Sequence, residues 1–291
     1  MHSRKQPESC LLKSFYKKPP VNYHACMTKP DSLLGNLVHQ HEDEEGPITI
    51  YQNHNLRYLT FGNQTEQSCL TIDKPHRLEH VYTQAMMLGL LMKADIRSVL
   101  LMGLGGGSLA RALRHFREKL KIDAIEYRQS VIDIAKRYFD LPDDEGLNIF
   151  CTDAREYIES TDKTYDLIFT DLYLPAGMDE AQLNESYLSR CRQQLNENGI
   201  LVINFWSNDF KQTVLRQQAI KQAFGDDVLN VQVHGGNTIT FAFKDAMPNL
   251  NKKDFFADAQ QLGKKLDIPL QGLARSLWQL NAATLQLRRY R

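Results

Sequence analysis

The chain has 291 residues, of which 42% are hydrophobic, so it is long and apolar enough to bury a sizeable core. Its 35 Lys and Arg residues equal its 35 Asp and Glu residues, and this balance gives no electrostatic reason to expect nucleic acid or an anionic membrane as a partner. The 5 cysteines are scattered without a C-x-x-C pair, which argues against a disulfide framework and against a metal site. No long apolar run follows the polar, basic start of the chain, so we expect a soluble cytoplasmic protein without a membrane span.

The first part of the chain is expected to contribute a small sheet. Residues 1–46 lack a clear hydropathy period and contain Pro19-Pro20, so we predict an irregular N-terminal segment. Beyond it, β-branched and aromatic residues alternate with polar ones between turn residues, which predicts antiparallel strands. A helical period of apolar residues follows, with Met86 and Met87 assigned to the core. Residues 47–94 are therefore expected to form strands at 48–51, 56–61 and 68–72 and a helix at 78–94.

The middle of the chain alternates between apolar strands and amphipathic helices, which predicts a doubly wound α/β sheet of mainly parallel strands. The alternation ends in two strands around Gly235-Gly236-Asn237, which indicate an antiparallel hairpin. This combination is typical of the class I S-adenosylmethionine methyltransferase-like Rossmann fold, which we predict for residues 95–245, followed by C-terminal helices at 246–291. The expected strands are 98–102, 122–126, 147–151, 166–171, 200–205, 228–233 and 238–243, and the expected helices are 107–117, 130–139, 154–160, 180–195 and 209–224.

A glycine cluster that includes Gly103, Gly105 and Gly107 follows the first strand of this domain and opens a helix. Glycines there let the backbone turn tightly and approach a ligand closely, although a plain turn has the same composition. The spacing from Gly105 through Gly107 to Ala110 also fits a loose dinucleotide-binding pattern. The terminal hairpin favours a sulfonium nucleoside over NAD.

Acidic residues follow the next two strands. Glu126 ends the second strand, where a carboxylate can accept both hydroxyls of a ribose. Asp153 follows the third strand, where it can receive an adenine amino group, and Ala154 leaves room for the ring. Alone, Glu126 fits a solvated strand end and Asp153 fits a helix N-cap. Because open α/β sheets bind ligands at the carboxyl ends of their strands, the coincidence of these residues with the glycine cluster predicts a nucleoside site.

Taken together, these motifs resemble those of the spermidine synthase (polyamine aminopropyltransferase) family, as a divergent member. The resemblance covers about residues 47–245. The glycine motif and the Asp-Ala pair are shared with many methyltransferases, whereas Asp171-x-x-x-Pro175 and the preceding sheet with Gln67 and Tyr82 are more particular to aminopropyltransferases. The motifs that carry it are Val99-Leu100-Leu101-Met102-Gly103-Leu104-Gly105-Gly106-Gly107, Ile125-Glu126, Asp153-Ala154-Arg155-Glu156 and Tyr165-Asp166-Leu167-Ile168-Phe169-Thr170-Asp171.

The resemblance implies transfer of an aminopropyl group from decarboxylated S-adenosylmethionine to a polyamine, with release of methylthioadenosine and without a metal. It assigns Asp171 as the base, Gln67 to the cofactor and Tyr82 and Tyr173 to the amine substrate. It also implies a homodimer. A carboxylate that only caps the loop after its strand is the simpler interpretation of Asp171.

The sequence departs from the family pattern at three positions where acids are usual. Gly106, Leu174 and Gln84 stand there instead. Because a diamine dication needs opposite charges to offset its desolvation, putrescine is expected to bind poorly unless other acids substitute. The candidates are Asp179, Glu180 and Glu185.

Two other functions remain open. Without an acid at position 106, discrimination against intact S-adenosylmethionine should weaken, which leaves a methyltransferase on the same scaffold as an alternative. A non-catalytic paralogue that binds a nucleoside is the third hypothesis. The residues alone do not distinguish the acceptor or choose between the intact and the decarboxylated cofactor.

Overall fold

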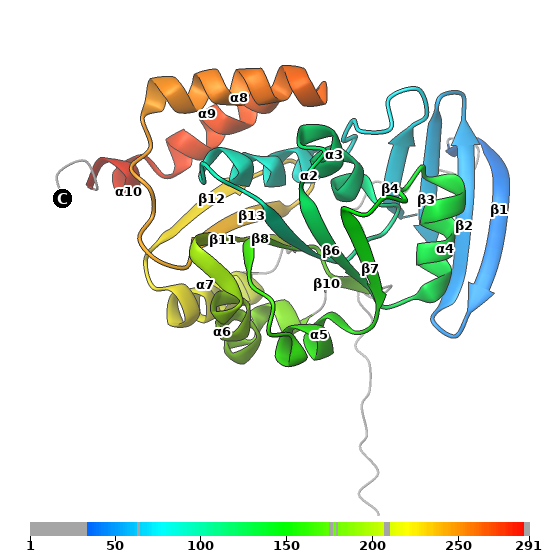
Figure 1. The fold of residues 1–291 in the computed structure, drawn as a ribbon, viewed down its shortest axis with the longest axis horizontal. Coiled ribbons are helices and arrows are strands. Elements are labelled where there is room, and N and C mark those ends of the chain that lie inside the picture. Colours follow the sequence, from blue (N-terminus) through cyan, green and yellow to red (C-terminus); the bar gives the residue numbers. More distant parts are fainter. Residues whose placement is uncertain (1–33, 63–64, 175–176, 179, 207–209, 288–291) are drawn as a thin grey trace, which may run out of the picture.

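The computed structural model describes residues 34–62, 65–174, 177–178, 180–206 and 210–287, which include two principal sheets (Figure 1). The first is a four-stranded antiparallel sheet in the order β1-β2-β3-β4. The prediction of an irregular 1–46 segment is wrong for β1, and residues 1–33 lie outside the described part. Nearly every β1 side chain is exposed, so no apolar alternation marks this strand in the sequence. The strands are β1 (Asn36–Asp43), β2 (Gly46–Asn53), β3 (Leu56–Phe61) and β4 (Glu66–Thr71).

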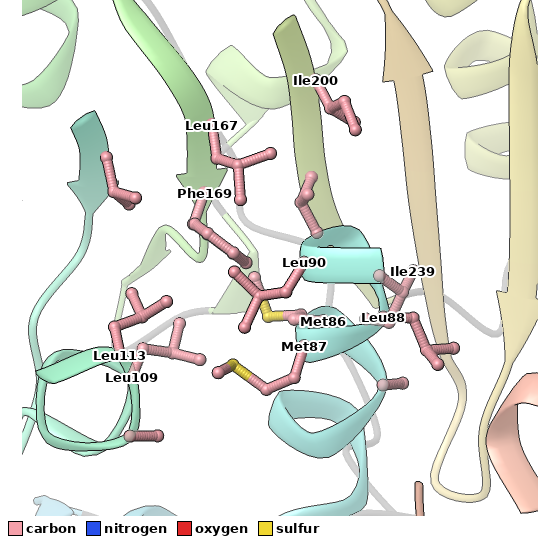
Figure 2. Close-up of a cluster of buried hydrophobic side chains, with 14 of the residues drawn as sticks. Met86, Met87, Leu88, Leu90, Leu109, Leu113, Leu167, Phe169, Ile200 and Ile239 are labelled. Atoms are coloured by element: carbon pink, nitrogen blue, oxygen red, sulfur yellow. The ribbon is translucent and has the colours of Figure 1, made fainter. Parts of the chain in front are cut away.

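The segment after this sheet forms two short helical pieces instead of the single helix expected at 78–94. Helix α2 (Val81–Met86) continues directly into the 3₁₀ helix η1 (Met87–Leu91). A Cβ on Gly89 would lie 2.9 Å from Cγ2 of Val202, so the backbone of η1 packs tightly on the second sheet. Figure 2 shows Met86 and Met87 among core side chains of the neighbouring helix and strands, and both methionines are fully buried as predicted.

The second sheet has seven strands in the order β12-β13-β11-β8-β5-β6-β7. Strands β5 to β8 and β11 are parallel, and β13 runs antiparallel to β11 and to β12. This arrangement confirms the predicted fold, including its terminal hairpin. The strands are β5 (Ser98–Met102), β6 (Lys121–Glu126), β7 (Leu147–Cys151), β8 (Tyr165–Thr170), β11 (Leu195–Trp206), β12 (Val228–Gln232) and β13 (Asn237–Phe243), and a separate small hairpin pairs β9 (Tyr173–Leu174) with β10 (Gly177–Met178).

Helices cover both faces of the seven-stranded sheet (Figure 1). One buried cluster joins the sheet to α2, η1, α3, α8 and α9, and a second joins its other face to α5, α6 and α7. Helix α4 contributes to the first cluster and also packs on the small sheet. The helices are α3 (Ser108–Phe116), α4 (Gln129–Tyr138), α5 (Ala154–Ser160), α6 (Glu185–Gln193), α7 (Phe210–Phe224), α8 (Lys252–Leu266), α9 (Leu270–Leu280) and α10 (Ala282–Leu287), with a 3₁₀ turn η2 (Glu180–Leu183).

The helix expected at 180–195 is interrupted at Asn184. Its side chain accepts a hydrogen bond from the backbone N–H of Ser186 at 2.8 Å and so caps α6. An amide that satisfies a free N–H group of the first turn favours a helix start at this position. The 3₁₀ turn η2 therefore precedes α6 as a separate element.

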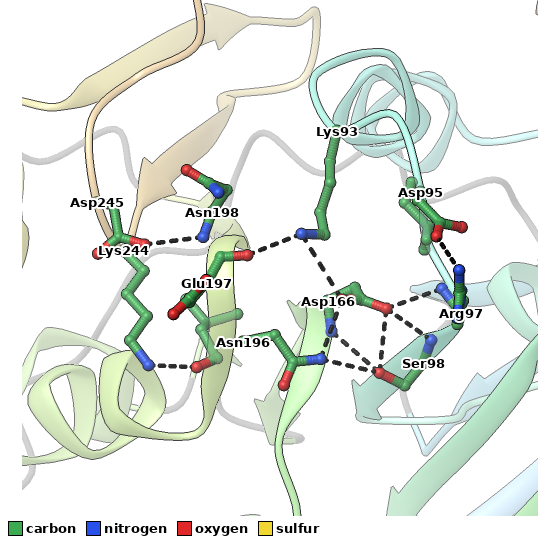
Figure 3. Close-up of polar contacts among 12 residues, drawn as sticks. Lys93, Asp95, Arg97, Ser98, Asp166, Asn196, Glu197, Asn198, Lys244 and Asp245 are labelled. Atoms are coloured by element: carbon green, nitrogen blue, oxygen red, sulfur yellow. Dashed lines mark hydrogen bonds and ion pairs between the residues drawn. The ribbon is translucent and has the colours of Figure 1, made fainter.

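A polar network fixes the amino ends of the central strands (Figure 3). Asp166, at the start of β8, accepts hydrogen bonds from the backbone N–H groups of Arg97 at 2.8 Å and Ser98 at 3.0 Å. Asn196 donates to the same carboxylate at 3.0 Å, and the Lys93 ammonium lies 3.7 Å from it. These contacts tie β5, β8 and β11 together at one end of the sheet, and the opposite end carries the candidate site.

Candidate functional site

A cleft of about 310 Å³ opens at the carboxyl ends of β5, β6, β7 and β8, where the small sheet meets the seven-stranded sheet. Its volume suits a small organic ligand. The small sheet and the segment before α2 provide one wall, and the loops after the parallel strands provide the other. The residues predicted for the site that line this cleft are Gln67, Tyr82, Gly103, Gly105, Glu126, Asp153, Ala154, Asp171 and Tyr173.

The loop after β5 requires glycine at two positions, because each has a positive φ and no space for a Cβ. Gly103 has φ of +95°, and a Cβ there would clash with the carbonyl oxygen of Asp171, so only glycine lets the ends of β5 and β8 approach each other. Gly107 has φ of +77° and precedes α3, and a Cβ there would clash with Leu141. Gly107 does not line the cleft, so its predicted cofactor contact is not supported by its position.

Glu126 extends from the end of β6 toward the glycine loop. Its Oε2 accepts hydrogen bonds from the backbone N–H groups of Leu104 at 3.2 Å and Gly105 at 3.3 Å, and Oε1 accepts from that of Arg128 at 3.1 Å. Burial raises the pKa of Glu126, while these donors favour its charged form. An ionised carboxylate in a fixed orientation can accept hydrogen bonds from the hydroxyls of a sugar.

Asp153 is both the N-cap of α5 and part of the cleft wall. It accepts a hydrogen bond from the backbone N–H of Arg155 at 2.7 Å and from Nε of the same residue at 2.9 Å. These hydrogen bonds are the main reason that the pKa of Asp153 is lowered. The capping role and the lining role coexist, and the small buried side chain of Ala154 lies beside it on the wall.

Asp171 lies immediately after β8 at one end of the cleft. Its Oδ1 accepts a hydrogen bond from Nδ2 of Asn204 at 2.8 Å, and the Tyr82 hydroxyl donates a second hydrogen bond to the carboxylate. Burial raises the pKa of Asp171, and the two donors and the nearby His80 oppose that rise. The carboxylate does more than cap a loop, because it faces the cleft and is held by side chains from α2 and β11.

Several residues of the site carry no sequence motif. His80 stacks on Tyr82 with ring centroids 5.5 Å apart, and its Nε2 lies 2.9 Å from Oε1 of Glu66. Ser68 faces the glycine loop from β4 and accepts a hydrogen bond from the N–H of Gly106 at 2.8 Å. Both His80 and Ser68 come from the N-terminal part of the chain, far in sequence from the loops that they face.

Arg128 joins the small sheet to the wall formed by β6. Its Nη2 lies 2.6 Å from Oδ1 of Asp43, and its guanidinium lies 4.8 Å from the ring centroid of Phe61. Ser130 donates a further hydrogen bond to Asp43. Asp43 and Phe61 belong to β1 and β3, so this contact holds the small sheet over the cleft.

The three positions that depart from the family pattern have different environments. At Gly106 a Cβ would lie 2.9 Å from Cβ of Ser68 and 3.0 Å from Cδ1 of Phe139, so a larger side chain would require these neighbours to shift. Gln84 is buried outside the cleft and donates to the carbonyl of Leu78 at 2.7 Å. The side chains of Leu174 and of two of the proposed substitutes lie outside the described part, and the third, Glu185, is exposed at the start of α6 and does not line the cleft.

In residues 34–287, apart from the short gaps, no helix has the length and apolar character needed to cross a bilayer. Over the same part of the chain, no group of three or more His, Cys, Asp or Glu side chains is arranged to hold a metal ion.

Comparison with solved structures relates this fold to two kinds of protein. A spermidine synthase in complex with the transition state analogue AdoDATO aligns with a TM-score of 0.68 at 19% identity, over 86% of this chain and 88% of that one. Human methyltransferase-like protein 13 in complex with SAH aligns with a TM-score of 0.56 at 23% identity, over 65% of this chain and 93% of that one. Both share the Rossmann-like sheet.

Sequence comparison is more specific than the fold. The polyamine aminopropyltransferase of Neisseria meningitidis serogroup A is 30% identical over 207 residues, which span 70% of this chain and 78% of that protein. The profile of the spermine/spermidine synthase domain matches residues 79–254, which hold the glycine loop, Glu126, Asp153 and Asp171. The chain therefore belongs to the spermine/spermidine synthase family and is a transferase.

Proposed function

We propose that this protein transfers an aminopropyl group from decarboxylated S-adenosylmethionine to an amine of a polyamine and releases methylthioadenosine. The family and the relative from Neisseria meningitidis support this reaction class. The observation that carries the proposal is the position of Asp171. It shares one cleft with Glu126 and the glycine loop, and a side-chain hydroxyl and an amide hold its carboxylate there.

The donor substrate fits the residues of the cleft by chemistry. Glu126 offers an oriented carboxylate to the ribose hydroxyls, and Asp153 offers a carboxylate beside the small Ala154, where an adenine ring can lie. The solved relatives with AdoDATO and SAH show that this fold accepts such ligands in other proteins. A glycine loop at the end of β5 leaves the backbone open to close approach.

The reaction requires alignment and the removal of one proton. The amine nitrogen attacks the methylene carbon next to the sulfonium, a C–N bond forms, and the C–S bond breaks with its electron pair retained by sulfur. The leaving group is the neutral thioether methylthioadenosine. The proton of the attacking nitrogen passes to Asp171, whose pKa burial raises and which is therefore a better acceptor than a solvated carboxylate.

The direct test is the release of methylthioadenosine by the purified protein. The protein is incubated with decarboxylated S-adenosylmethionine and a panel of di- and triamines, and the nucleoside product is quantified. We expect release with at least one amine, and a decrease in rate of about 10²–10⁴-fold in Asp171→Asn, because a general base contributes on that scale. Binding of the donor without turnover on any amine of the panel would refute the proposal.

A methyltransferase is the second candidate, and Gly106 is the observation that favours it. The glycine loop therefore carries no acid at this position to repel the carboxylate of intact S-adenosylmethionine, and a Cβ there would press on Ser68 and Phe139. The likeness to a methyltransferase-like protein that binds SAH points the same way. Formation of S-adenosylhomocysteine from the intact cofactor and a cellular acceptor would favour this alternative.

A further inference from the structure

Two asparagine side chains form a hydrogen-bonded row behind Asp171. Asn204 lies on β11, is 1% exposed, and donates from Nδ2 to Oδ1 of Asp171 at 2.8 Å. Its Oδ1 accepts a hydrogen bond from Nδ2 of Asn237 at 2.9 Å. The row therefore crosses three adjacent strands, from the end of β8 through β11 to the start of β13.

The second hydrogen bond determines which end of the Asn204 amide faces Asp171. If the amide were flipped, its oxygen would oppose the carboxylate and its NH₂ group would oppose that of Asn237, so both contacts would be lost. The hairpin that carries Asn237 is itself fixed, because Nε1 of Trp206 donates to the carbonyl of Gly235 at 2.8 Å. In this arrangement Asn204 is the donor and Asp171 the acceptor.

The other charged and titratable groups around Asp171 come from different elements. Tyr82 on α2 donates a hydrogen bond to it, His80 precedes α2, and Tyr173 follows β8. Burial raises the pKa of Asp171, and among the groups that oppose it the hydrogen bond from Asn204 is the largest. A buried carboxylate that receives such a donor is favoured in its ionised form over its protonated form.

We propose that Asn204, oriented by Asn237, is a positioning residue that keeps Asp171 an ionised acceptor facing the cleft. This inference rests on the proposed function, in which Asp171 takes a proton from the attacking amine. A protonated carboxyl has no capacity for that proton and attracts an ammonium only weakly. Asn204 is buried and does not line the cleft, so it acts through the carboxylate.

The test measures the titration of Asp171 directly. The ¹³C carboxyl signals of protein labelled at aspartate are followed by NMR as a function of pH, and Asp171 is assigned by its absence in Asp171→Asn. Asn204→Leu keeps the branched shape of the side chain and removes the donor, so we expect the pKa of Asp171 to rise by about one unit. Asn237→Ser is expected to shift it in the same direction by less, because Asn204 keeps its donor but loses its orientation.

Asn230→Leu is the matched control. Asn230 lies on β12 of the same sheet, and its Oδ1 accepts a hydrogen bond from Oγ1 of Thr240 at 2.7 Å, so its loss removes a comparable contact on a strand that does not adjoin Asp171. This variant is expected to leave the titration unchanged. If Asn204→Leu fails to fold, Asn237→Ser, whose original side chain is half-buried, carries the test.

The titration separates this inference from the proposed function. Superimposable curves for the wild type and Asn204→Leu, or an equal shift in Asn230→Leu, would overturn the positioning role. The expected shifts in a protein that releases no methylthioadenosine would support the positioning role and refute the reaction. Where turnover is measurable, the acidic limb of its pH profile is expected to move upward with the pKa of Asp171, a change that simple loss of stability does not produce.

Discussion

Two carboxylates of the cleft, Glu126 and Asp171, are both buried enough for their pKa to rise, yet they are held in different ways. Glu126 accepts hydrogen bonds from backbone N–H groups, which cannot rotate away, so the orientation of its carboxylate is as rigid as the glycine loop. Asp171 is held by the side chains of Asn204 and Tyr82. A fixed carboxylate suits recognition of a sugar, whereas a carboxylate held by side chains suits a group that must gain and release a proton.

Glu126→Gln should weaken nucleoside binding more than it affects folding. The amide NH₂ would oppose the N–H groups of Leu104 and Gly105, and one acceptor for the ribose hydroxyls would be lost. We expect the Kd for methylthioadenosine to rise at least about tenfold, which equals about 1.4 kcal/mol. Isothermal calorimetry measures this change, with the exposed Glu118→Gln as control, and equal affinities in the two variants would contradict the assignment.

Sequence alone could place the residues that follow strands, because strand ends of a parallel sheet converge on one edge. This reasoning brings Glu126, Asp153 and Asp171 to the same cleft. Asn204 also left a signal, as the single polar residue in an otherwise apolar run at 200–205. His80 and Ser68 left none, because their place in the cleft depends on how the small sheet docks on the large one.

At the scale of elements, the loop after β5 determines how closely the carboxyl ends of β5 and β8 approach each other. Gly103 has φ of +95°, and a side chain there would clash with the backbone of Asp171. The same sheet explains the interruption of the helix expected at 78–94, since Gly89 packs against Val202 and the chain tightens into a 3₁₀ turn. Periodicity predicted the buried face correctly but could not predict this tightening, which tertiary packing imposes.

Two glycine substitutions should have opposite effects on stability. Gly103→Ala forces an alanine into a left-handed conformation and places its Cβ against the backbone of Asp171. We expect this strain to reduce the free energy of unfolding by about 1–3 kcal/mol and to abolish nucleoside binding. Gly272→Ala, in α9, meets no atom within 4 Å and should stabilise the protein by about 0.5–1 kcal/mol. Urea unfolding measures both, and a Gly103→Ala protein as stable as the wild type would contradict the close approach of β5 and β8.

At the scale of the whole molecule, the small N-terminal sheet completes the cleft. Its buried residues pack on α4, and the ion pair between Asp43 and Arg128 joins it to the wall that carries Glu126. Burial alone would raise the pKa of Asp43, but the hydrogen bonds from Arg128 and Ser130 outweigh it and lower the pKa from 3.8 to about 2. Strand β1, which provides Asp43, could not be predicted from hydropathy because it buries almost nothing.

This ion pair should make the stability of the protein depend on acid pH. Because the pKa of Asp43 is lower in the folded state, its stabilisation is complete above the unfolded value and disappears as pH falls from about 4 to about 2. Asp43→Asn should therefore reduce the free energy of unfolding by about 2 kcal/mol at pH 7 and by almost nothing near pH 2. Urea unfolding at several pH values measures the gap, with the exposed Glu44→Gln as control, and a gap independent of pH would exclude the ion pair as its source.

Calorimetric titration with three thioadenosines tests the central claim most directly. Methylthioadenosine, decarboxylated S-adenosylmethionine and intact S-adenosylmethionine are titrated separately into the wild-type protein and into Glu126→Gln. We predict that the first two bind at one site per chain, that the intact cofactor binds no more tightly than the decarboxylated one, and that Glu126→Gln weakens all three. If none of the three thioadenosines binds, the cleft is not a nucleoside site. If the intact cofactor binds most tightly, the cleft is not the site of an aminopropyltransferase.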